Sequence, residues 1–243
     1  MRRYAIYRIH YGLDFLGQSI DSILNHVDKV FIFWSKQPWF KECKDLPPMN
    51  EDVYRFVHTR YPKNDKITLW EREYEKPLNQ FHLIYTEICS FMPRPDQVLC
   101  MEPDMVWGDD IKKIWDIKDA EISFKQVEFW KNEEWYVKRE QERPGPTLYN
   151  GVVPSTKKGC FSNIDLVHPD YKCYNYGFCL SPETMLYKHE VAIQSSKYYK
   201  DSPPSKEWYQ DKWLNWTPET RDLEISEAHR HLIEKAHPWV SQK

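Results

Sequence analysis

Strand-like and helix-like patterns alternate through residues 2–102, and this alternation limits the chain to few folds. Each strand pattern is followed by a helix pattern, in which apolar residues recur three and four positions apart. The expected strands are 2–10, 28–35, 66–73 and 96–102, and the expected helices are 14–27, 50–61 and 78–92. Repeated strand–helix–strand units form a mostly parallel sheet with right-handed crossovers. We therefore expect an α/β fold with a mostly parallel central sheet flanked by helices, and Asp14 at the start of the first helix is a suitable cap.

The second half of the chain carries less regular patterns. The expected elements are one or two strands over 121–140, a loop over 143–159, a strand, turn and helix over 174–194, and helices over 206–216 and 227–239. Ser181 is a plausible cap for the helix that begins at Pro182. We interpret residues 1–243 as one domain, with a ligand-binding half over 1–118 and a second half over 119–243.

Composition excludes several classes of protein. The formal net charge of −3, without a block of lysine and arginine, argues against binding to nucleic acid or an anionic membrane surface. No apolar run reaches the roughly 18 residues that a membrane helix requires, and the N-terminal residues lack the pattern of a signal peptide. We therefore expect a soluble, cytoplasmic protein with no integral membrane segment. No pattern specifies its oligomeric state.

Two acids stand at the end of the fourth expected strand, Glu102 and Asp104, separated by Pro103. In open α/β sheets, ligands bind at the carboxyl ends of the strands, so these acids would lie at the edge that forms the site. Carboxylate oxygens there suit Mg²⁺ or Mn²⁺ shared with the phosphates of a nucleotide. The alternative is that both acids only cap or solvate the turn that follows the strand.

The order of these patterns resembles the GT-A fold of nucleotide-diphospho-sugar glycosyltransferases, of the kind found in family 2-like enzymes. The residues that carry the resemblance are Phe15-Leu16, Ile20, Ser22-Ile23-Leu24, Val27-Asp28-Lys29-Val30 and Glu102-Pro103-Asp104. The resemblance covers residues 3–110 and lies in the pattern rather than in a match to one protein. Glu102 departs from it, because the family usually has aspartate as the first acid of this D-x-D motif.

The resemblance implies where the donor nucleotide and the metal would bind. Asp104, the last acid of the motif, would ligate the metal directly, with Glu102 beside it. The ends of the first two strands and the start of the helix before the acids would contact the nucleotide sugar through Arg8, His10, Tyr11, Ser35, Asn79 and Gln80, again with Glu102. For His10, a role as an ordinary turn histidine is an equal alternative.

Two further sites follow from the C-terminal patterns. Glu207 and Asp211 lie four residues apart on one helical face, where a general base for an acceptor hydroxyl would fit. The alternative is a solvated acidic face over a tryptophan core. In many GT-A enzymes a C-terminal histidine completes the metal site, and His237 is the best match, ahead of His229. Without a metal, His237 would simply favour the dipole at a helix end.

These observations lead to one preferred function and two alternatives. The preferred one is a metal-dependent glycosyltransferase, which uses Mn²⁺ or Mg²⁺ to move a sugar from a nucleotide-diphosphate sugar to a glycan or other hydroxyl acceptor. The alternatives are a non-catalytic glycan-binding module and a sugar nucleotidyltransferase. A nucleotidyltransferase fits less well because the expected glycine-rich basic loop is missing after the first strand, where HYGLD has one glycine and no lysine. The sugar, the base, the acceptor and the stereochemistry are left open.

Overall fold

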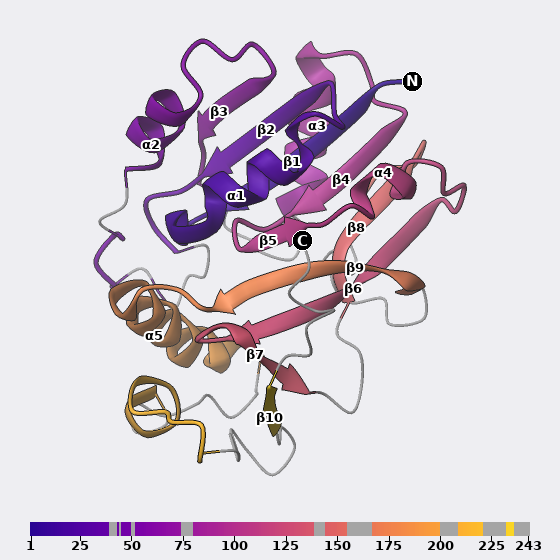
Figure 1. The fold of residues 1–243 in the computed structure, drawn as a ribbon. Coiled ribbons are helices and arrows are strands. Elements are labelled where there is room, and N and C mark those ends of the chain that lie inside the picture. The colour runs from indigo at the N-terminus through magenta and orange to yellow at the C-terminus, as the bar shows by residue number, and fades with distance from the viewer. Residues whose placement is uncertain are drawn as a thin grey trace.

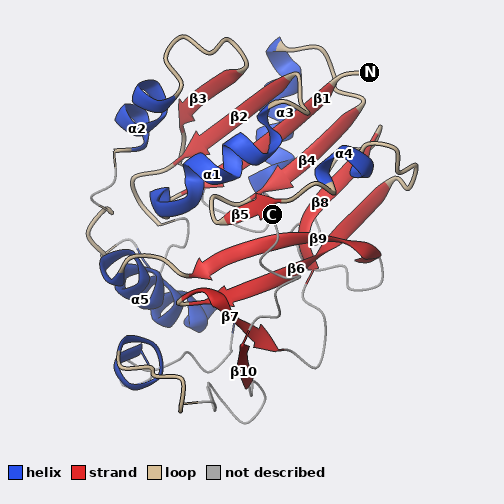
Figure 2. Cartoon of the chain, in the orientation of Figure 1, coloured by secondary structure: helices blue, strands red, loops and turns tan. Residues whose placement is uncertain are grey.

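The computed structural model of the chain describes residues 1–38, 43, 45–49, 52–73, 80–138, 144–154, 167–199, 209–220 and 232–235. Strands and helices alternate along the first half, and longer strands dominate the second (Figures 1 and 2). The helices are α1 (Leu13–Leu24), α2 (Val53–Arg60), α3 (Gln80–Phe91), α4 (Ile111–Ile114), α5 (Pro182–Tyr199) and the π-helix η4 (Tyr209–Leu214). The strands are β1 (Arg3–Ile9), β2 (Lys29–Trp34), β3 (Ile67–Glu71), β4 (Gln97–Met101), β5 (Met105–Trp107), β6 (Glu121–Trp130), β7 (Asn132–Lys138), β8 (Pro144–Asn150), β9 (Val167–Phe178) and β10 (Leu232–Lys235).

One ten-stranded sheet runs through both halves, in the order β10-β7-β6-β8-β4-β1-β2-β3. The four strands expected from the first half, β3, β2, β1 and β4, are parallel neighbours. Antiparallel strands extend the sheet beyond β4, and β9 branches from it by pairing with both β6 and β5. The predicted α/β class, with a helix-flanked central sheet, is confirmed.

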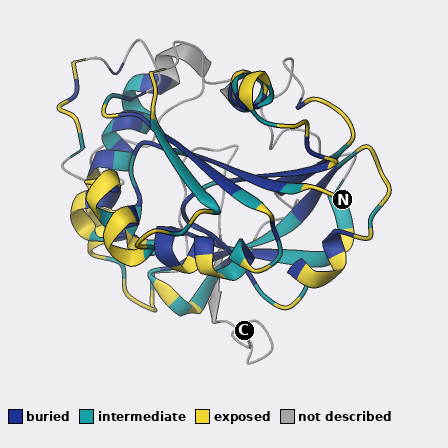
Figure 3. Cartoon of the chain, turned by 90° about the horizontal axis from the view of Figure 1, so that it is seen from above, coloured by how far each residue is buried: buried dark blue, intermediate teal, exposed yellow. Residues whose placement is uncertain are grey.

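The alternation of side chains along β1 explains why helices cover both faces of the sheet. Ala5, Tyr7 and Ile9 point to the face covered by α1, whereas Tyr4 and Ile6 point to the face covered by α3. The same division holds on the neighbouring strands, which explains their nearly continuous apolar sequences. The burial view shows dark, buried strands between helices with exposed outer faces (Figure 3).

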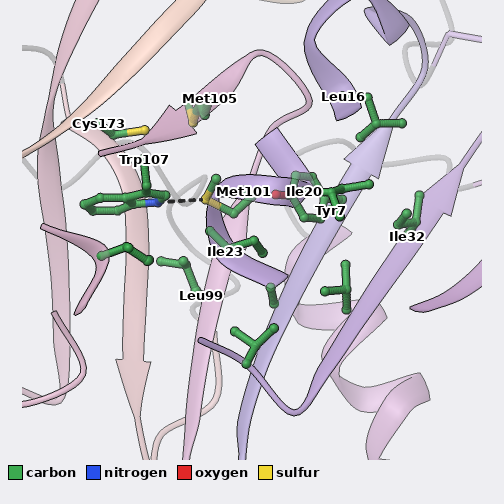
Figure 4. Close-up of a cluster of buried hydrophobic side chains, with 14 of the residues drawn as sticks. Tyr7, Leu16, Ile20, Ile23, Ile32, Leu99, Met101, Met105, Trp107 and Cys173 are labelled. Carbon is green, nitrogen blue, oxygen red and sulfur yellow. Dashed lines mark hydrogen bonds between the residues drawn. The ribbon is translucent and has the colours of Figure 1, made fainter. Parts of the chain in front are cut away.

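The face under α1 also anchors β5, the short strand that follows the E-P-D sequence. The indole Nε1 of Trp107 donates to the sulfur of Met101 at 3.3 Å, within the cluster drawn in Figure 4. Two serines of α1 bond the backbone of β5: Ser19 Oγ donates to the carbonyl of Met105, and Ser22 Oγ accepts from the amide of Trp107 at 3.1 Å. The turn between β4 and β5 is therefore fixed at both ends.

Helix α1 begins differently from the expectation. Gly12 is its N-cap residue, with φ of 97°, a left-handed conformation that glycine adopts without steric cost. Asp14 is the second residue of the helix, and its carboxylate accepts the amide of Ser181 at 3.2 Å. The prediction of Asp14 as a cap was wrong because the glycine ends the preceding loop two residues earlier.

The second half differs from the sequence interpretation in two places. The expected loop over 143–159 contains β8, in which pairing with β4 begins at Thr147, just after Pro146. Pro144 and Pro146 therefore lie where β8 pairs only with β6, beside an irregularity in the register of these two strands. Because proline has no amide to donate, this position leaves the hydrogen bonds between β8 and β4 intact. Within the segment 121–140, Glu121–Trp130 form β6 and Asn132–Lys138 form β7, which is the two-strand alternative of the prediction.

The C-terminal helices expected over 206–216 and 227–239 were wrong in part. The first is the short π-helix η4, and residues 232–235 form β10, which pairs antiparallel with β7. Without β10, β7 would be the edge strand of the sheet and would expose unpaired backbone groups. Pairing with these groups overrides the helical pattern of residues 232–235. Helix α5 agrees with its prediction, since Ser181 Oγ accepts the amide of Thr184 at 3.3 Å. None of the helices in the described part of the chain is both long and apolar enough to span a bilayer.

Candidate functional site

A cavity of about 300 Å³ lies at the carboxyl ends of β1 and β4. These ends point toward β9, β6 and α5 (Figure 1), and residues of those three elements line the cavity from the second half of the chain. Its walls combine three carboxylates, two cations, two amides, aromatic rings and backbone, from Arg8, His10, Tyr11, Glu102, Pro103, Asp104, Met105, Gln126, Glu128, Asn175, Gly177, Phe178 and Lys188. The predicted edge of the sheet is therefore where polar groups of both halves meet.

A backbone hydrogen bond to β9 fixes the position of Asp104. It sits in the turn before β5, and its carbonyl accepts the amide of Tyr176 from β9 at 2.8 Å. The residue is buried, 7% exposed, and its Oδ2 lies 3.6 Å from the Nζ of Lys188 on α5. The last acid of the E-P-D sequence thus faces the cavity opposite a cation that the sequence did not identify.

Glu102 has a cation of its own. The guanidinium of Arg8, from the end of β1, donates to Glu102 Oε1 through both Nε and a terminal nitrogen, the Nε bond being 3.1 Å long. The guanidinium carbon also lies 4.9 Å from the centre of the Phe81 ring. Two hydrogen bonds and an aromatic face hold Arg8 in one orientation at the cavity wall.

The amide of Asn175 orders the opposite wall. Its Oδ1 accepts the amide of Gly177 at 2.7 Å and its Nδ2 donates to Gln126 Oε1 at 2.7 Å. A Cβ built on Gly177 would lie 2.7 Å from Lys188 Nζ and 2.8 Å from both Asn175 Oδ1 and Asp104 Oδ2. Any larger residue at this position would therefore have to displace at least one of these three polar side chains.

Glu128 adds a third carboxylate to the cavity. It lies on β6 opposite Asn175 of β9 and is 3% exposed. Lys188, Asn175, Gln126 and Glu128 were all missed from the sequence. Two features of the sequence could have pointed to this wall. Gly177 lies inside a strand pattern, where glycine often marks a close approach, and Glu128 lies within an apolar strand.

His10 connects three elements at the rim of the cavity. Its Nδ1 donates to the carbonyl of Ser35 after β2, so the neutral ring accepts at Nε2 from the hydroxyl of Tyr187 on α5, both at 2.9 Å. Burial lowers the pKa of His10, and the smaller, opposite effect of the hydrogen bond to Ser35 does not cancel it. The ring is therefore neutral. Tyr11 packs edge-on against His10 and Tyr187. Burial, followed by the charges of Glu102 and Asp104, raises the pKa of Tyr11.

The structure brings most of the predicted donor-site residues together. Arg8, His10, Tyr11, Glu102 and Asp104 all line the cavity. Ser35 is buried behind His10, and Gln80 is the first residue of α3.

The structure does not place the remaining predicted site residues in the cavity. Asp211 is exposed on η4 and is not among the residues that line the cavity. Asn79, Glu207, His229 and His237 lie outside the described residues. Their predicted roles stay predictions.

The cavity suits a divalent cation of the kind that is shared with a substrate. In the described ranges of the chain, no group of three or more His, Cys, Asp or Glu side chains is arranged to hold a metal by itself. Mg²⁺, however, usually binds proteins through only one or two carboxylates, with phosphate oxygens and water completing its shell. Asp104 and Glu102, which line one cavity two residues apart, fit that pattern.

We expect Gly177→Ala to damage the cavity more than the fold. The added methyl group must displace Lys188, Asn175 or Asp104, all of which are side-chain groups, whereas the backbone of Gly177 has no positive φ that would be strained. Binding of a cavity ligand should weaken by at least about tenfold, while unfolding free energy falls by roughly 1–3 kcal/mol. Titration calorimetry and urea unfolding measure the two effects. In the control Gly108→Ala, the methyl would meet only Tyr174, at 3.3 Å, and ligand affinity should be retained.

The comparisons with known proteins give distant structural likenesses. No protein-family model matches the chain, and no curated protein matches it by sequence. Among solved structures, HddC from Yersinia pseudotuberculosis is similar at 10% identity over 72% of this chain and 89% of that chain, with a TM-score of 0.41. The 4-diphosphocytidyl-2C-methyl-D-erythritol synthase from Anaerococcus prevotii is similar at 9% identity over 82% and 96%, with a TM-score of 0.39.

A galactosyltransferase, LgtC, in complex with donor and acceptor sugar analogs, is also similar, at 9% identity over 60% of this chain and 57% of that chain, with a TM-score of 0.33. Likeness at this level does not identify a reaction, which has to follow from the residues of the cavity.

Proposed function

We propose that the protein is a glycosyltransferase that moves a sugar from a nucleoside-diphosphate sugar to a hydroxyl acceptor. The observation that carries this proposal is the meeting of the E-P-D acids, two cations and the buried Glu128 in one cavity at the carboxyl ends of parallel strands. Ligands of open α/β sheets bind at this edge. A diphosphate requires positive charge around it, and the departure of a sugar from it requires that the charge on the leaving group be stabilised.

The residues of the first half are suited to the donor. Arg8, held by Glu102 and Phe81, presents a fixed guanidinium to the cavity. Asp104 and Glu102 would hold the divalent cation, which when bound neutralises the diphosphate leaving group. The rings of His10 and Tyr11 form the rim near the end of β1, where a base and ribose would lie.

Glu128 is suited to the acceptor hydroxyl. A general base must come within hydrogen-bond reach of the proton that it removes, so it has to line the cavity in which the sugar is transferred. Glu128 does so, whereas Asp211 is exposed on η4 and is not among the cavity residues. We therefore assign the base to Glu128 in preference to the Asp211 and Glu207 pair that the sequence suggested.

The test is a release assay with a panel of UDP-, GDP- and other nucleoside-diphosphate sugars. With the matching donor and Mn²⁺, the parent protein should release the nucleoside diphosphate, and EDTA should slow this release by at least about 100-fold. Release of pyrophosphate from a nucleoside triphosphate and a sugar 1-phosphate would identify a nucleotidyltransferase instead. Glycan binding without turnover of any nucleotide would identify a non-catalytic module.

A further inference from the structure

The two cations of the cavity hold the E-P-D acids in different ways. Arg8 is hydrogen-bonded to Glu102 and stacked on Phe81. Lys188 Nζ lies 3.6 Å from Asp104 Oδ2, beyond hydrogen-bond distance, and donates instead to the carbonyl of Gly177 at 2.8 Å. One cation is therefore fixed to its acid, whereas the other faces its acid across a gap and is tethered to the backbone.

We propose that Lys188 is an exchangeable counter-ion of Asp104, which moves to the diphosphate when a divalent cation takes its place. This inference rests on the proposed function, because it requires a diphosphate and a metal in the cavity. It makes Lys188 a positioning residue for the donor. In the unliganded protein, Lys188 offsets the charge of a carboxylate whose side chain is only 10% exposed.

The geometry allows the exchange at small cost. The Lys188 side chain is 27% exposed and carries its charge on a flexible stem, so that Nζ can turn toward the open cavity without movement of α5. Moving Nζ away from Asp104 breaks an ion-pair contact and the 2.8 Å hydrogen bond to the Gly177 carbonyl, and a phosphate oxygen would replace the latter. Gly177, which has no side chain to intervene, leaves the space in which Nζ, Asn175 Oδ1 and Asp104 Oδ2 converge.

The exchange couples the binding of metal and nucleotide. Lys188 competes with a divalent cation for Asp104, so a metal alone binds weakly. A diphosphate gives the displaced ammonium a new partner, and it therefore tightens metal binding. By linkage the metal tightens nucleotide binding by the same factor.

The experiment measures Mn²⁺ binding by electron paramagnetic resonance and nucleotide binding by calorimetry in the full chain. In Lys188→Met, Mn²⁺ alone should bind about tenfold more tightly than in the parent, because the competing charge is gone. UDP or GDP at saturating Mn²⁺ should bind about tenfold more weakly, because a phosphate partner is lost. The control Lys112→Met removes a lysine from an exposed pair with Asp109, 3.1 Å apart, and should change neither constant.

In Lys188→Met, the affinity for Mn²⁺ should rise while the affinity for the nucleotide falls. If Lys188 had only a structural role, its loss would lower both affinities. Lys188→Arg retains the charge and should keep both constants within about threefold of the parent, which provides a second test if the methionine variant does not fold. Unchanged or weaker Mn²⁺ binding in Lys188→Met, with normal binding in the parent, would overturn the exchange alone. A parent that binds neither Mn²⁺ nor any nucleotide would overturn the proposed function as well.

Discussion

Asp104→Asn should abolish the stabilisation that Mn²⁺ and a nucleoside diphosphate confer together. At about 100 times its dissociation constant, a ligand raises unfolding free energy by roughly 2.7 kcal/mol, which corresponds to a rise of about 5–10 °C in the melting temperature of a chain of this size. We expect that rise in the parent with UDP or GDP plus Mn²⁺, and a much smaller one with either component alone. In the asparagine variant the rise should fall below about 2 °C.

Mn²⁺ and the nucleotide should bind together because of the negative charge in the cavity. Arg8 and Lys188 offset the charges of Glu102 and Asp104, but Glu128 and a diphosphate leave an excess of negative charge, so the nucleotide needs a cation that binds to the acid. Asparagine keeps the size of Asp104 but removes its charge. The matched control is Asp109→Asn, since Asp109 belongs to the same segment but its side chain is 86% exposed and pairs with Lys112. Equal stabilisation of parent and Asp104→Asn would show that the acid is an ordinary turn residue.

The position of Asp104 could be predicted because it depends on local patterns and one general rule. Apolar alternation identifies the strand before Glu102, and the edge at which ligands bind follows from parallel topology. Arg8 and His10 were identified through the resemblance to the GT-A fold, as residues at the end of the first strand. These predictions use only the order of elements along the chain, which the first half displays clearly.

The other wall of the cavity could not be predicted because it depends on pairing between distant strands. Glu128 faces Asn175 only because β6 pairs parallel with β9, and Lys188 reaches Asp104 only because α5 packs beyond β9. Such registers are set by the tertiary fold, and a shift of one residue would turn Glu128 to the other face. For the same reason the helical pattern around 232–235 was misleading, since the edge of β7 decides the conformation there.

Glu128→Gln should lower kcat for sugar transfer by about 10²–10³-fold while leaving the affinity for the donor nearly unchanged. Glutamine fills the same buried position on β6 but cannot accept a proton from an acceptor hydroxyl. Because a general base acts only when deprotonated, the parent rate should fall at low pH, and this acidic limb should be missing from the residual activity of the variant. Donor binding, measured by calorimetry with Mn²⁺, should stay within about threefold, since Glu128 is assigned to the acceptor.

Asp211→Asn is the decisive comparison for this prediction, because the sequence pattern favoured Asp211 whereas the cavity favours Glu128. Asp211 is exposed on η4, and its substitution should change kcat by less than about twofold. A large loss of kcat in Asp211→Asn with normal turnover in Glu128→Gln would place the base on η4 and require that helix to approach the acceptor. An activated hydroxyl that attacks in one displacement inverts the anomeric carbon, so NMR of the product should show the anomer opposite to that of the donor.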